Sequence, residues 1–226
     1  GLAAIKGLGN AAVDVIISER EKNGTYKNIF DFLNRVNLRT VNKKSIEALA
    51  MAGAFDSMDI HRAQFFYKLP NEDITFLEKI IRHIALTQNK QNSMQQSLFG
   101  ESSETEIPDP ELPVCEPWST IEMLNHEKEV IGFYMSGHPL DNFRIEIRHF
   151  TNFTLDKCEN LSLFAGRDIR FAGMIIQAEH KINKNNKPFG YFKLEDYSGA
   201  TRLNLWSENY DKFKHLLEIG KCIFVS

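Results

Sequence analysis

The sequence predicts an α+β protein with more than one domain, an all-α N-terminal region and a β-rich C-terminal region. Over the first 58 residues apolar side chains recur at helical spacing, as in Val13, Ile16 and Ile17. From Asp168 onward they alternate or run together between glycines and asparagines, which is typical of strands. A stretch rich in Gln, Asn, Ser, Glu and Pro lies between. We therefore expect helical residues 1–86, a flexible linker 87–117, a helical connector 118–164 and a β domain 165–226.

The composition excludes several classes of protein. Of the 226 residues 42% are hydrophobic and 11% aromatic, which is enough to build cores. A net charge of -3 argues against a protein that coats nucleic acid by bulk positive charge. The three cysteines lack any metal-binding spacing, so we expect no metal site and a reducing compartment. No apolar run approaches 18 residues, so we expect a cytoplasmic protein with no membrane partner.

The segment IKGLGN, residues 5–10, precedes a helical run. Two glycines around one apolar residue allow a tight turn and leave the amides of Leu8, Gly9 and Asn10 unpaired at a helix N-terminus, where a phosphate can bind. This is the helix-hairpin-helix pattern, and its phosphate contact is independent of DNA sequence. The alternative is a plain connector between helices. The predicted phosphate-binding residues of this turn are Lys6, Gly7, Leu8, Gly9 and Asn10.

A weaker second copy lies in residues 29–55, where the Gly-x-Gly turn is absent. Asn42 is a suitable N-cap for the helix that follows. Lys43 and Lys44 occupy the first turn of that helix, where they oppose the helix dipole. Cations at that end indicate an anionic partner such as a DNA phosphate, although solvated surface lysines are the simpler alternative.

Within the polar linker, Leu98 and Phe99 form an adjacent apolar pair that is poorly placed for a core and well placed for an external pocket. With Gln95 they form a Gln-x-x-Leu-Phe pattern. It resembles the short peptide by which bacterial polymerases bind the sliding clamp. Such short patterns also arise by chance.

The β-rich region contains three strand-like segments, a short helix over Ser207–Leu217 and a fourth strand, an order that suits a five-stranded barrel of the OB type. Ser226 falls inside the fourth strand. Because a barrel without its last strand exposes an edge, we expect the chain to be a piece of a longer protein.

Lysines next to flat rings are the parts of a single-strand binding groove. Alternation along a strand sends Tyr191 and Phe192 to opposite faces, so one of them belongs to the core. We expect Phe189 and Tyr191 to be the exposed rings. The predicted single-strand site is Lys181, Lys184, Lys187, Phe189 and Tyr191.

Several segments together resemble one family, the alpha subunits of bacterial DNA polymerase III, which are C-family replicative polymerases. They are GLAAIKGLGNAAVDVIISERE, FDFLNRV, VNKKSIEALAMAGAFD, EVIGFYMSGHPLD and YFKLEDYSGATRLNLWSE. The resemblance implies tandem hairpins that grip duplex DNA, a clamp-binding peptide and an OB domain facing single-stranded template. It also implies partnership with other replicase subunits.

The same resemblance implies that the catalytic aspartates, and the Mg²⁺ that the parent polymerase uses, lie outside this chain. We find no nucleotidyl-transfer site, Walker loop or nucleophile elbow, and expect no cofactor in this non-catalytic piece. Two alternatives stay open. One is a hairpin and OB fragment of a DNA ligase or repair enzyme, although bacterial ligases place the barrel first and carry a four-cysteine zinc module. The other is a protein-interaction module.

Overall fold

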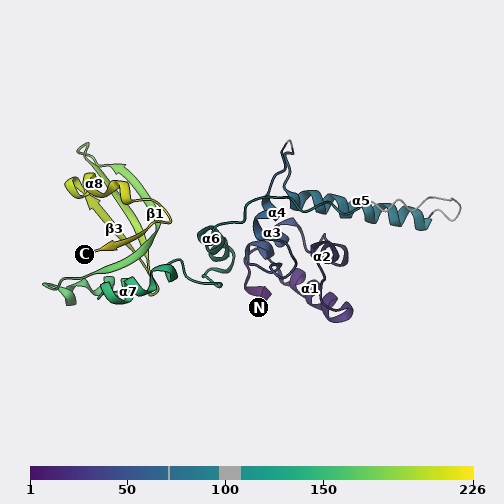
Figure 1. Ribbon diagram of the computed structural model, residues 1–226, viewed down its shortest axis with the longest axis horizontal. Helices are drawn as coiled ribbons and strands as arrows, with labels where there is room; N and C mark the ends of the chain where they lie inside the picture. The colour runs from purple at the N-terminus through teal and green to yellow at the C-terminus, as the bar shows by residue number, and fades with distance from the viewer. Residues whose placement is uncertain (71, 97–107) are drawn as a thin grey trace. The chain divides into compact units, whose positions relative to one another are not determined.

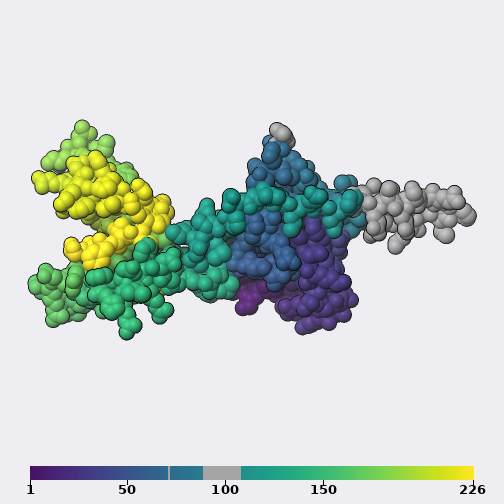
Figure 2. Space-filling view, in the orientation of Figure 1, coloured from purple at the N-terminus to yellow at the C-terminus, as the bar shows by residue number. Residues whose placement is uncertain are grey.

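The chain forms two compact units, unit 1 from Gly1 to Met135 and unit 2 from Ser136 to Ser226. The computed structural model describes residues 1–70, 72–96 and 108–226, and for residues 89–96 it describes the backbone alone. In Figures 1 and 2 unit 1 runs from purple to teal and unit 2 from green to yellow.

Unit 1 is built from short helices around one apolar core. Asparagine and serine caps start several of them. Asn28 accepts a hydrogen bond from the Asp31 amide at 2.8 Å, and Ser119 and Glu122 form a reciprocal capping box. The elements are η1 (Leu2–Ala4), α1 (Asn10–Asn23), α2 (Ile29–Arg35), α3 (Lys43–Met51), α4 (Arg62–Phe66), α5 (Phe76–Gln96) and α6 (Thr120–Ile131).

Helix α5 corrects the expected linker. It continues to Gln96, ten residues into the stretch expected to be flexible, and Figure 1 shows it extending beyond the packed helices of unit 1. Residues 87–96 contain neither Gly nor Pro and include Lys, Gln and Met, which favour helix. Farther along, Pro113 is buried and its carbonyl accepts a 2.7 Å hydrogen bond from Gln64 Nε2.

The expected connector is divided between the two units, and α6 belongs to unit 1. Glu127 of α6 is fully buried and accepts a 2.8 Å hydrogen bond from Arg62 Nη1. Arg62 also pairs with Asp56 at 2.7 Å. The carbonyl of Val130 accepts the amide of Lys6 at 2.7 Å. Because buried charges need such partners, these contacts fix α6 against α4, which lies more than 50 residues earlier in the chain.

Unit 2 contains a curled antiparallel sheet of four strands in the order β3-β2-β1-β4 (Figure 1). Three strands, a helix and a fourth strand follow one another as the sequence predicts. Phe192, Leu194 and Ile175 lie in its core. Its elements are η2 (Asp141–Phe143), α7 (Arg144–Phe150), η3 (Leu155–Phe164), β1 (Phe171–Ile182), β2 (Pro188–Glu195), β3 (Ala200–Trp206), α8 (Ser207–Phe213), η4 (Lys214–Leu216) and β4 (Cys222–Val225).

Candidate nucleic-acid interface

The predicted turn at residues 6–10 lies on the surface. Lys6, Gly7, Gly9 and Asn10 are exposed, while the side chains of the flanking apolar residues are buried in the core of unit 1. Gly7 has a φ of +87°, a conformation that residues with a Cβ rarely adopt. The apolar residues therefore anchor the turn, and its polar backbone faces solvent.

Most of the amides of the turn are free. Within the described part of the chain, Gly7, Gly9, Asn10 and Ala11 donate no backbone hydrogen bond. The prediction of a free amide at Leu8 is wrong, because this amide donates to the carbonyl of Ile5 at 3.2 Å and closes the turn. Free amides at the N-terminus of the 14-residue helix α1 create a local positive potential that suits an anion.

Lys44 of the predicted second copy lies beside the first turn. A methyl group placed on Gly7 would be 3.9 Å from Lys44 Cε, and Ser45 Oγ donates to the Gly7 carbonyl at 3.4 Å. Among the described residues Lys6 and Lys44 form no ion pair, and both are exposed. The two predicted copies thus meet in one cationic turn, which we define as residues 6–11 with Lys44.

Lys43 is paired with two glutamates and therefore adds no unpaired charge to the cationic turn. Its Nζ lies 2.8 Å from Glu78 Oε1 and 3.4 Å from Glu47 Oε1. The hydrogen bond from Lys43, followed by one from the Thr75 amide, lowers the pKa of Glu78 to about 2. The anionic partner predicted for Lys43 is therefore present within the protein, and it is Glu78 of α5.

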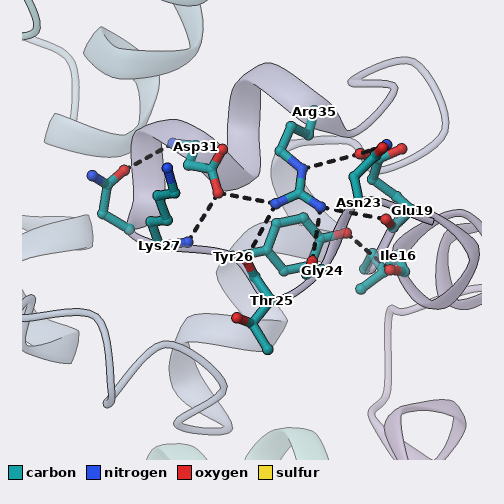
Figure 3. A network of polar contacts seen from close by, with 10 residues as sticks. Ile16, Glu19, Asn23, Gly24, Thr25, Tyr26, Lys27, Asp31 and Arg35 are labelled. Atoms are coloured by element: carbon teal, nitrogen blue, oxygen red, sulfur yellow. Dashed lines mark hydrogen bonds and ion pairs between the residues drawn. The ribbon is translucent and has the colours of Figure 1, made fainter. Parts of the chain in front are cut away.

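The far end of α1 is held by the guanidinium of Arg35, as Figure 3 shows. It donates to Glu19 Oε1 at 3.0 Å, to Asp31 Oδ2 at 3.0 Å and to the Gly24 carbonyl at 2.9 Å. Its Cζ lies 4.5 Å from the centroid of the Tyr26 ring. These contacts fix α1 to α2, so the helix that carries the cationic turn is anchored at both ends.

In unit 2, strands β1, β2 and β3 turn one face away from the core. Cross-strand register aligns Lys181 with Phe189 and Phe189 with Trp206. Alternation along each strand fixes which residues share this side. We call it the open face, and its eleven residues are Gln177, Glu179, Lys181, Phe189, Tyr191, Lys193, Glu195, Ala200, Arg202, Asn204 and Trp206.

The structure corrects the expected exposure of Tyr191. Its ring is only 8% exposed, because the Arg202 guanidinium lies 3.6 Å and Lys181 Nζ 4.9 Å from its centroid. Tyr191 does lie on the same face as Phe189, while Phe192 belongs to the core as alternation requires. Lys184 and Lys187 are exposed in the loop between β1 and β2.

Sequence reasoning missed Trp206. Its ring stacks on Phe189 with centroids 4.6 Å apart and an interplanar angle of 13°, and it stays 53% exposed. The sequence does contain a signal for this residue, because Trp206 ends the alternating, strand-like segment ATRLNLW. Identifying its neighbour required the register of β3 on β2.

Other predicted features have no described geometry. Leu98 and Phe99 lie outside the described residues, and Gln95 is described only as backbone in the last turn of α5. In the part of the chain that the structure describes, no group of three or more His, Cys, Asp or Glu side chains is arranged to hold a metal ion. Likewise, no described helix has the length and apolar character needed to cross a membrane.

Two family models match the chain. Residues 1–65 match a helix-hairpin-helix motif, and residues 169–226 match an OB-fold nucleic acid binding domain. They coincide with the helices that carry the cationic turn and with the sheet that carries the open face. The predicted α+β fold, helical hairpins followed by an incomplete OB barrel, is confirmed.

Curated relatives match the chain over its whole length. It is 33% identical to DNA polymerase III subunit alpha from Borreliella burgdorferi, 29% identical to the subunit from Vibrio cholerae and 29% identical to that from Escherichia coli. Each alignment covers 100% of this chain and 19% of the relative. The resemblance to this family is confirmed, and the chain spans about a fifth of the length of these relatives.

Proposed function

We propose that this chain is the DNA-holding region of a bacterial replicative DNA polymerase alpha subunit, with the cationic turn on duplex DNA and the open face on single-stranded template. The chemistry of the polymerase, its Mg²⁺ and its contacts with other replicase subunits belong, in this proposal, to the remainder of a cytoplasmic parent protein. This chain supplies binding alone.

The observation that carries the proposal is the set of free amides beside two unpaired lysines in the cationic turn. A phosphate seated there accepts hydrogen bonds from the amides of Gly9 and Asn10 and charge-assisted contacts from Lys6 and Lys44. Each of these groups contacts the DNA backbone and reads no base, which suits an enzyme that must copy every sequence.

The test compares two neighbouring lysines of α3. Lys44→Ala should weaken binding to a labelled primer-template duplex by about tenfold, because it removes a charge-assisted contact. Lys43→Ala is the matched control, with the same change of charge at the adjacent position but on a lysine already held by Glu78. Equal losses from both variants would indicate bulk attraction in place of a built site, and no loss from Lys44→Ala or Lys6→Ala would end the duplex proposal.

For the single strand we propose that bases stack on Trp206 beside Phe189, with phosphates along Lys184, Lys187 and Lys193. Stacking contributes about 1–3 kcal/mol per base, so Trp206→Ala should weaken oligo(dT) binding at least about fivefold. Phe150→Ala, an aromatic residue of α7 that is 58% exposed, is the control. The proposal fails if the two variants bind oligo(dT) equally well.

For the clamp we retain Gln95, Leu98 and Phe99 as a proposed binding peptide, supported by its pattern and by the polymerase relatives. A double variant Leu98→Ala, Phe99→Ala should lose capture by an immobilised bacterial sliding clamp while keeping its thermal unfolding profile. Leu86→Ala removes an exposed apolar side chain from helix α5 and should leave capture intact. Undiminished capture by the double variant would mean that the peptide has been misread.

A further inference from the structure

The open face carries two acidic residues, Glu179 and Glu195, and Glu179 holds a lysine. Glu179 Oε2 lies 3.0 Å from Lys181 Nζ, and Glu179 Oε1 accepts a 2.9 Å hydrogen bond from Gln177 Nε2. Lys193, Arg202 and Glu195 supply the other charges of this face. The carboxylate of Glu179 therefore lowers the positive potential beside Lys181, where a DNA phosphate would be attracted.

Glu179 remains charged under ordinary conditions. Hydrogen bonds from Tyr191 and then from Lys181 lower its pKa to about 2, so it is ionised throughout the physiological pH range. Lys181 in turn donates to the Tyr191 hydroxyl at 3.3 Å. Its ammonium group is therefore directed toward Glu179 of β1 and Tyr191 of the neighbouring β2.

The pair between Lys181 and Glu179 lies beside the stacked rings of the open face. Lys181 is the cross-strand partner of Phe189, and Phe189 stacks on Trp206, so one row across the sheet contains a cation and two rings. A nucleotide stacked on those rings brings a phosphate to that row. Glu179 competes with this phosphate for the same ammonium group.

We propose that Glu179 is an internal competitor for the DNA phosphate and sets a weak affinity of the open face for single-stranded DNA. This inference rests on the proposed single-strand function of that face. A surface ion pair is worth little and exchanges readily, so a passing phosphate can replace the carboxylate and be replaced by it. Such exchange lets a template strand slide through without being held.

The opposite role for Glu179 is that of a positioning residue that aims Lys181 at the DNA. The two roles predict changes of opposite sign. Removal of a competitor tightens binding, whereas removal of a positioning residue, or any loss of local structure, weakens it. A gain of affinity is therefore a result that a structural role cannot produce.

The experiment uses the full chain and a fluorescein-labelled oligo(dT) strand at several salt concentrations. Glu179→Gln keeps the side-chain shape and should tighten binding about threefold to tenfold at low salt. Freeing one more lysine should also make the slope of log Kobs against log salt more negative by about 0.7. Glu218→Gln is the matched control, because it neutralises a glutamate paired with Lys221 at 3.7 Å outside the open face.

A third variant assigns the gain to Lys181. Lys181→Ala in the Glu179→Gln background should abolish the gain, since the two residues act on one phosphate. Unchanged or weaker binding by Glu179→Gln, or a gain that survives loss of Lys181, would overturn this inference. If Trp206→Ala nevertheless weakens binding, only the inference has failed. If Trp206→Ala has no effect, the single-strand function itself has failed.

Discussion

Two glycines of unit 1 adopt left-handed backbone but have very different surroundings. Gly7 has a φ of +87°, and a methyl group there would make ordinary contacts with Ala48 Cβ at 3.8 Å and Lys44 Cε at 3.9 Å. Gly53 has a φ of +77°, and its methyl group would overlap the guanidinium of Arg62 and lie 2.7 Å from Cζ. That guanidinium is itself held by Asp56 and buried Glu127, so it cannot move aside without breaking both pairs.

We predict that Gly53→Ala lowers the free energy of unfolding by about 3 kcal/mol or more, because it combines backbone strain with displacement of a buried cation. Gly7→Ala should cost only about 1 kcal/mol, from its backbone strain alone. Urea unfolding of both variants and of the unaltered chain measures the two losses. Similar losses at the two positions would contradict the role given to Arg62.

At the scale of elements, Glu78 joins the N-termini of α3 and α5. Its carboxylate accepts the Thr75 amide at 2.8 Å, which caps α5, and it pairs with Lys43 of α3. Since the folded state lowers the pKa of Glu78 from 4.5 to about 2, its contribution to stability is present above pH 4.5 and is lost as the pH falls toward 2.

We therefore predict that Glu78→Gln flattens the pH dependence of the unfolding temperature between about pH 4.5 and 2, and lowers that temperature at pH 7. Glu116→Gln, an exposed glutamate outside this pair, serves as the control. An acid limb that is identical in the Glu78→Gln variant and the unaltered chain would show that the pair adds nothing to stability.

At the scale of the whole molecule, a net charge of -3 means that duplex binding must depend on few contacts. With two or three phosphates neutralised by the cationic turn, the slope of log Kobs against log salt on duplex DNA should be about -2 to -3. Fluorescence anisotropy over a salt series measures it. A slope near zero would exclude phosphate contacts, and one near -6 would require a broad basic surface.

Most of the local features could be predicted from the sequence. The Gly-x-Gly turn, the Ser119 capping box, the Asn42 N-cap and the order of strands and helix in unit 2 all depend on residues a few positions apart. Backbone conformation and periodicity are decided over such short distances. The family resemblance drew on the same short segments.

The sites depended on contacts between distant residues, which local patterns do not contain. Lys43 is paired with a glutamate 35 positions away, and α6 is fixed by a buried glutamate 65 positions from its arginine. Trp206 gains its role from the register of β3 on β2.

The sequence alone therefore determined the kind of elements, their order and the exposed turn. Only the tertiary structure decided which lysines are free, which ring is open and which carboxylate pairs with Lys181 on the open face. The physical reason is that an ion pair or a stack forms only where folding brings two side chains within a few ångströms, whatever their separation along the chain.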